Sequence, residues 1–179
     1  MDKRYTLAIL VNNHSGVLMR VVGLFSRRGY NIDSLSVGVT EDPAISRITI
    51  VVTGDRAVVE QIKKQVGKLY DVIRVHEMTS RTSLQYELVM VKISVTPETR
   101  TSIVELGEIF KAKVLDVTET TLSMQLTGSL DKIESFLGLV SPYGIVEMVR
   151  TGITALERGS RPLSAFSDDE SFESPLEGA

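Results

Sequence analysis

Residues 5–25 read YTLAILVNNHSGVLMRVVGLF, and this stretch decides the fold of the first half of the chain. Its opening, 5–11, is a nearly continuous apolar run of strand length, as expected for a strand buried on both faces. Turn-forming and capping residues follow at 12–16. Apolar side chains then recur at helical spacing, at Leu18, Val21, Val22 and Phe25. The stretch predicts a strand, a tight turn and a helix, which Gly29 is placed to end.

The same order of elements occurs twice along the chain. After the first helix, apolar patterns predict strands over 35–39 and 48–52, a helix over 58–69 and a strand over 72–78. The second set comprises strands over 86–95, 114–117, 122–126 and 145–149, with helices over 97–110, where Pro97 takes the first helical position, and over 130–140. This order predicts an α+β fold: two ferredoxin-like βαββαβ units in tandem, with antiparallel sheets and helices on one face.

Composition along the chain sets the expected boundaries. We predict a first domain over 1–78, a short polar linker over 79–83, a second domain over 84–158 and a tail over 159–179. The tail is rich in Ser, Pro and acidic residues, so it cannot bury enough apolar area to offset the entropy of ordering it. Disorder is the expected state, and an acidic interaction tail anchored by Phe166 and Phe172 is the alternative.

Bulk composition excludes several classes of protein. The chain has 179 residues, no cysteine and a net charge of -3, which excludes disulfides, thiolate metal sites and an overall basic surface for nucleic acid. No apolar run approaches the length of a membrane span, and the first is too short for a signal peptide. We therefore expect a cytoplasmic protein, with an organelle protein whose transit peptide is missing from this sequence as the alternative.

The sequence carries none of the common catalytic motifs. The two histidines, His14 and His76, are far apart, and no HExxH, GxSxG or GxxxxGK[ST] pattern occurs. The carboxylates fall mainly on predicted helix surfaces and turns, where solvation explains them. We expect no catalytic residue, no metal site and no cofactor in this chain.

The turn after the first strand carries an Asn-x-x-Gly spacing, from Asn13 to Gly16. N–H groups at a helix start lack intrahelical partners, and the helix dipole favours a negative group there. Gly16 would let a carboxylate approach the backbone closely, and Asn13 could position an amino group. However, polar residues and glycine are typical of any tight strand-to-helix turn, in which Ser15 would simply be the N-cap of the helix. Composition alone leaves a binding loop and a plain turn as alternatives.

A longer set of residues resembles the small (regulatory) subunit family of acetolactate synthase. Its segments are NHSGVL at 13–18, GLFSRRGYNIDSL at 23–35, SRIT at 46–49, DV at 71–72, ELVMVK at 87–92, IF at 109–110 and DVT at 116–118. The resemblance covers roughly residues 5–158. It implies an ACT domain followed by an ACT-like domain, and a chain that has a regulatory role and no active site of its own.

The resemblance also implies a ligand site and partners. Two ACT domains would dimerise side by side, and valine or another branched-chain amino acid would bind at their seam. By motif match one surface of this site comprises Asn13, His14, Ser15, Gly16, Val17 and Leu18, and the other comprises Asn31 and Ile32. The ligand's side chain would lie against Val17, Leu18 and Ile32. The catalytic large subunit would be the partner that carries thiamine diphosphate, FAD and magnesium, and its activity would be raised by this chain and inhibited through valine.

The second predicted domain lacks the Asn-x-x-Gly spacing. Thr96-Pro97-Glu98 stands at its first turn, and Glu98 would repel a carboxylate, so we interpret this domain as a module for partner contact or coupling. Two other functions remain as alternatives. One is a free-standing amino-acid sensor for a different enzyme. The other is an RNA-binding protein, although the strand RITIV at 47–51 lacks the aromatic residues that this module needs.

Overall fold

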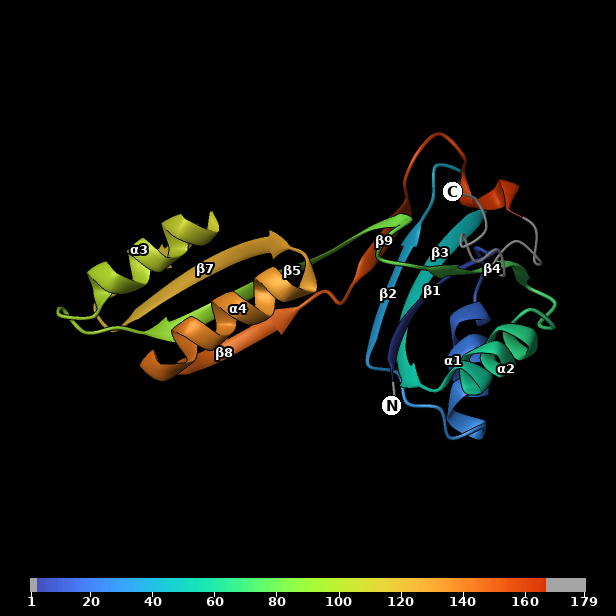
Figure 1. Cartoon of the computed structure of the whole chain (residues 1–179), viewed down its shortest axis with the longest axis horizontal. Helices are drawn as coiled ribbons and strands as arrows, with labels where there is room; N and C mark the ends of the chain where they lie inside the picture. Colours follow the sequence, from blue (N-terminus) through green and yellow to red (C-terminus); the bar gives the residue numbers. More distant parts are fainter. Residues whose placement is uncertain (1–2, 167–179) are drawn as a thin grey trace, which may run out of the picture. The chain divides into compact units, whose positions relative to one another are not determined.

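The computed structural model describes residues 3–166 and has the predicted α+β fold (Figure 1). The chain forms two compact units, one of residues 85–154 and one of the described residues on either side of it. The first unit contains β1 (Lys3–Asn12), α1 (Val17–Arg27), β2 (Ser34–Val39), β3 (Ile45–Gly54), α2 (Arg56–Val66) and β4 (Val72–Met78). The elements that follow are β5 (Ser83–Ser94), α3 (Arg100–Phe110), β6 (Lys113–Val117), β7 (Thr121–Gly128), α4 (Leu130–Val140), η1 (Ser141–Tyr143), β8 (Ile145–Arg150), β9 (Thr154–Glu157) and η2 (Leu163–Ala165).

The first unit is built on a four-stranded antiparallel sheet in the order β2-β3-β1-β4. Figure 1 shows α1 and α2 against one face of this sheet. Leu7, Ile9 and Val11 of β1 point to that face and join Phe25 and Ile62 in the core between sheet and helices. The predicted order of elements in this unit is confirmed.

The end of α1 follows its sequence signal. Gly29 adopts a positive φ of 70°, which a residue with a side chain rarely takes. The N–H of Tyr30 then donates to the carbonyl of Phe25 at 3.0 Å. The aromatic rings of these two residues pack edge to face, with 6.3 Å between their centroids. This is the hydrogen bond and apolar contact of a Schellman ending, and it turns the chain toward β2.

The other face of the first sheet is covered by the end of the chain. Ala8 and Leu10 alternate with the core residues of β1 and so point away from the helices. They pack with Met78 of β4 and with Ala155 and Leu163, both buried. We call residues 155–166 the C-terminal strap; it begins in β9 and includes η2, which lies near β4 (Figure 1).

Polar contacts also hold the strap. Arg47 donates to the carbonyl oxygen of Ala155 at 2.6 Å, and His76 Nε2 lies 3.1 Å from a carboxylate oxygen of Glu157. Phe166 packs on the His76 ring with 4.6 Å between centroids. The strap thus differs from the prediction, which assigned 84–158 to the second domain and began a disordered tail at 159. The described part of that tail is ordered because it fills the open face of the sheet; residues 167–179, Phe172 included, lie outside the described residues.

The buried His76 should make the stability of the first unit depend on pH. Burial lowers the pKa of His76, while Glu157 acts in the opposite direction; Lys63 and Glu77 also face the ring. The unfolded chain therefore binds a proton more readily than the folded chain, so the free energy of unfolding falls as pH drops through about 6.5. Urea denaturation between about pH 7.5 and about pH 5.5 should show a larger loss of stability in the wild type than in His76→Gln. Equal losses in both proteins would contradict this role of His76.

The second unit repeats the predicted order around a sheet β6-β7-β5-β8, with β9 also pairing with β5. Val91, Met124 and Phe136 belong to its core, and α3 and α4 lie on one face of the sheet (Figure 1). Glu87 is buried and accepts two hydrogen bonds from the Arg150 guanidinium, at 2.8 and 2.7 Å. A buried carboxylate requires such a partner because charge is costly to desolvate.

Candidate functional site

The predicted Asn-x-x-Gly turn joins β1 to α1. Gly16 is the N-cap of α1 and has a φ of 87°, in the left-handed region that favours glycine. No side chain caps this helix end, so Ser15 is not the N-cap that the sequence allowed. Residues 13–16 are all exposed. The turn therefore presents its backbone, rather than a capping side chain, to whatever approaches the helix.

Several backbone N–H groups of this turn have no acceptor. Among the described residues, the amides of Ser15, Gly16, Leu18 and Met19 donate to no protein group, whereas Arg20 N bonds to the carbonyl of Gly16 at 3.1 Å. These free donors gather at the positive end of the helix dipole. The arrangement can accept a carboxylate at short range without a side chain in the way.

Asn13 is bound into the turn on one side. Its backbone N–H donates to the carbonyl of Ala44 at 2.7 Å, and its side-chain Nδ2 donates to the carbonyl of Pro43 at 2.8 Å. Both acceptors belong to the connection between β2 and β3. One N–H of the side-chain amide is thus used within the chain, and the carbonyl oxygen Oδ1 is the acceptor that can meet an amino group.

His14 is held by a residue that sequence reasoning did not place in the site. Its Nε2 lies 3.0 Å from Oδ1 of Asp71, and Oδ2 of the same carboxylate lies 2.6 Å from the guanidinium of Arg20. Asp71 is buried and immediately precedes β4. It falls 57 residues after His14 in the sequence, and no spacing rule links residues that only the sheet brings together.

The apolar residues predicted to meet the ligand lie in different environments. Val17 is 3% exposed and belongs to the core between sheet and helices, so its side chain is not open to a ligand. Leu18 is 39% exposed, and Ile32 is half-buried against the same core. Leu18 and Ile32 are therefore the apolar side chains of the predicted set that a ligand can reach.

The second predicted surface begins where α1 returns to β2. Asn31 is exposed, and its Nδ2 donates to Oδ1 of Asp33 at 3.0 Å. The other oxygen of Asp33 accepts a hydrogen bond from Thr53 Oγ1 at 2.6 Å and lies 4.0 Å from Arg4. Asn31 is thus oriented by an acidic side chain that is itself anchored to the neighbouring strand.

Strand register separates the two surfaces within one chain. Ser34, at the start of β2, pairs with Val51 of β3, which pairs on its other side with Thr6 of β1. The turn lies beyond Asn12, at the opposite end of β1. Six residues of strand span about 20 Å, so one copy of the chain does not bring Asn31 and Ile32 to the turn.

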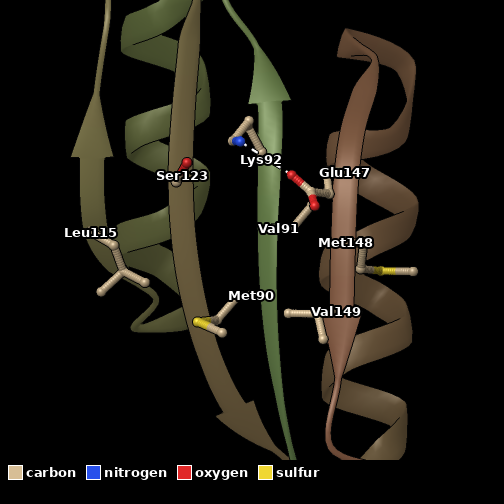
Figure 2. A pocket seen from close by; sticks show the side chains of 8 residues that line it. All are labelled: Met90, Val91, Lys92, Leu115, Ser123, Glu147, Met148 and Val149. Atoms are coloured by element: carbon tan, nitrogen blue, oxygen red, sulfur yellow. Dashed lines mark hydrogen bonds and ion pairs between the residues drawn. The ribbon is translucent and has the colours of Figure 1, made fainter.

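The second unit offers a different surface at its corresponding turn. A hydrogen bond with Thr96 holds the pKa of the exposed Glu98 below its ordinary value. On the sheet face away from α3 and α4, Met90, Leu115 and Val149 surround a shallow hollow of about 240 Å³ (Figure 2). Lys92 and Glu147 form an ion pair at 3.2 Å beside them. This hollow is mainly apolar and carries no unpaired charge that would select an amino acid.

Residues 3–166 contain neither a cluster of metal-ligating side chains nor a helix that could cross a membrane. No cluster of three or more His, Asp or Glu side chains there could hold a metal ion. No helix in that range has both the length and the apolar character that crossing a membrane requires.

Comparison with known proteins identifies the family. Residues 7–74 match the family described as the AHAS small subunit-like ACT domain, and residues 86–159 match the small subunit of acetolactate synthase. The chain is 44% identical over 159 residues to the acetolactate synthase isozyme 3 small subunit of Salmonella typhimurium, covering 88% of this chain and 98% of that one. It is 43% identical over 157 residues to the acetolactate synthase small subunit of Mycobacterium leprae, covering 88% and 93%.

A solved structure agrees with this result. The crystal structure of the acetolactate synthase small subunit from Thermotoga maritima superposes with a TM-score of 0.81 at 35% identity, over 89% of this chain and 99% of that one. Both halves of the chain match one family, and the fold agrees with a solved member of it. The chain belongs to the acetolactate synthase small subunit family.

Proposed function

We propose that this chain is the regulatory subunit of acetolactate synthase in branched-chain amino-acid biosynthesis. It binds the catalytic large subunit in the cytoplasm and raises its activity, without a catalytic site of its own. Valine, or another branched-chain amino acid, binds between the first units of two copies and inhibits the complex. The family membership supports the enzyme and the partner.

The geometry of the first sheet supports a site made from two copies. β2 is an edge strand, it runs parallel to β1, and its start lies at the end of the sheet opposite the turn. If two β2 edges pair antiparallel about a twofold axis, the start of one β2 lies level with the end of the other. Asn31 and Ile32 of one copy then approach the turn at Gly16 of its partner.

The chemistry of an amino acid fits the groups assembled in this way. The ligand carboxylate meets the free N–H groups of Ser15, Gly16, Leu18 and Met19, and the amino group meets the Asn13 carbonyl oxygen and the partner's Asn31. Leu18 and the partner's Ile32 supply apolar contacts for a branched side chain. A pocket of this kind distinguishes one methylene by only about 1–3 kcal/mol, so valine, leucine and isoleucine are all to be tested.

Inhibition follows from unequal binding to two states of the complex. Valine shifts the complex toward the inhibited state only if it binds that state more tightly, and the large subunit must alter valine affinity by the same factor. Reconstitution with an acetolactate synthase large subunit tests this. The chain alone should form no acetolactate, while its addition should raise the rate and make that rate sensitive to valine. Activity of the chain alone would refute the proposed function.

Asn31→Ala should weaken valine inhibition while activation of the large subunit is retained. Asn31 is exposed and lies outside the core, so the loss of one polar contact should lower valine affinity by about tenfold without unfolding the unit. Calorimetric titration and the reconstituted assay measure the two effects. Loss of activation together with inhibition would instead assign Asn31 a structural role.

A mixing experiment tests whether the site spans two copies. Gly16→Asp damages the turn surface and Asn31→Ala the other surface, so a mixed dimer contains one site with both changes and one site with neither. After subunit exchange of equal amounts, about one quarter of all sites should bind valine as the wild type does. Either variant mixed with itself is the control. No recovery after verified exchange would place both surfaces in one chain and contradict the proposed site.

A further inference from the structure

The side chain of Asp71 is a buried carboxylate that has no role in the proposed function as stated so far. Its side chain is 6% exposed, yet both of its oxygens are engaged, Oδ1 with His14 at 3.0 Å and Oδ2 with Arg20 at 2.6 Å. Its backbone carbonyl accepts a hydrogen bond from the N–H of Asn12 at 2.9 Å. Burying a charge in this way is costly unless its partners are held in place.

The partners of Asp71 lie before, within and after the turn that carries the free N–H groups of Ser15 and Gly16. Asn12 lies just before the turn, His14 lies within it, and Arg20 lies one helical turn beyond Gly16, to whose carbonyl its own N–H donates at 3.1 Å. Because α1 lacks a capping side chain, no side-chain hydrogen bond at the N-cap holds these amides in direction. Asp71, which immediately precedes β4, supplies a restraint through its contacts with Asn12 before the turn, His14 within it and Arg20 after it.

The charges are also balanced for an anionic ligand. An unpaired carboxylate beside the turn would repel a carboxylate ligand, but the Arg20 guanidinium neutralises Asp71 at hydrogen-bond distance. Asp71 can therefore orient His14 and Arg20 without opposing the ligand's charge. An asparagine at this position keeps only one oxygen acceptor, so it can accept a hydrogen bond from His14 or from Arg20 but not from both, and Arg20 loses its charged partner.

From this geometry we infer that Asp71 is a positioning residue for the amino-acid site: it holds the free N–H groups of Ser15, Gly16, Leu18 and Met19 in the arrangement that receives a carboxylate. This inference rests on the proposed function, because it concerns the same site. Asp71 does not touch the ligand and acts through His14, Arg20 and the backbone of Asn12. Its loss should lower valine affinity by loosening the turn before binding.

The test compares Asp71→Asn with Glu77→Gln. Each substitution replaces a largely buried, ion-paired carboxylate by its amide; Asp71 lies next to β4 and Glu77 lies in it. The partners of Glu77 are Arg56, at 2.6 Å, and Lys63. Both partners belong to α2 and lie away from the turn. Calorimetry should show valine binding about tenfold or more weaker in Asp71→Asn and unchanged in Glu77→Gln. Hydrogen exchange without ligand should show faster exchange at the Asn12 and Arg20 amides in Asp71→Asn than in Glu77→Gln.

A double-mutant cycle separates positioning from general stability. If Asp71 acts through His14, the losses of valine affinity in Asp71→Asn and His14→Ala should be less than additive in the double variant. Wild-type affinity in Asp71→Asn, or an equal loss in Glu77→Gln, would overturn the inference. A wild-type chain that binds no branched-chain amino acid would contradict the proposed function instead, while the exchange rates would still decide whether Asp71 holds the turn.

Discussion

Gly16→Asp is expected to abolish valine binding and, with it, feedback inhibition. A side chain at Gly16 would meet no atom within 4 Å, so the substitution fits sterically, although the φ of 87° costs about 1–2 kcal/mol for a residue other than glycine. The aspartate carboxylate would lie among the free N–H groups and take the position proposed for the ligand's own carboxylate. Like-charge repulsion in such a site should weaken valine binding by about a hundredfold or more.

Two controls separate charge from strain in this experiment. Gly16→Ala carries the same backbone cost without the carboxylate, and should retain measurable valine binding. Gly159→Asp adds the same charge at another exposed glycine with a similar φ of 84° and open space around it, outside the turn. Titration calorimetry and the reconstituted assay provide the measurements. Valine inhibition that persists in Gly16→Asp would remove the turn from the site.

Leu163→Asp is expected to destabilise the first unit strongly. Leu163 is 6% exposed and packs with Ala8, Leu10 and Met78 on the sheet face opposite the helices. An aspartate there loses the apolar contacts and buries a charge without a partner, which should lower the free energy of unfolding by about 3 kcal/mol or more. Urea denaturation followed by circular dichroism measures this loss.

Leu156→Asp is the matched control for the strap. Leu156 belongs to the same segment but is 59% exposed, so the same substitution there should change stability by about 0.5 kcal/mol or less. If Leu163→Asp were as stable as Leu156→Asp, the strap would contribute little to the first unit. The comparison therefore measures how much the end of the chain stabilises the sheet that it covers.

Local pattern predicted most of the fold, and the limits of that prediction are physical. The helix after Gly16 and its end at Gly29 follow from spacing and from a positive φ, which neighbouring residues alone specify. The continuous apolar run at 5–11 also predicted burial on both faces of β1. It could not say which segment covers the second face, because Ala155 and Leu163 come more than 140 residues later.

The candidate site shows the same division. The Asn-x-x-Gly turn was found from its sequence, and the structure leaves its amides free. Val17 was expected to contact the ligand, but helical phase turns it into the core. The contact between His14 and Asp71 was missed because it depends on β1 and β4 being neighbours in the sheet.

The sequence by itself determined the family, the order of strands and helices, and the turn that carries the free N–H groups. These features depend on residues close together in the chain, where spacing, glycine conformation and apolar periodicity act directly. Only the tertiary structure decided the strap on the first sheet, the restraint from Asp71 and the separation of the turn from Asn31. These three features depend on strand order and register, which bring residues distant in the sequence together or hold nearby residues apart. Neither produces a periodic pattern in the sequence from which it could be predicted.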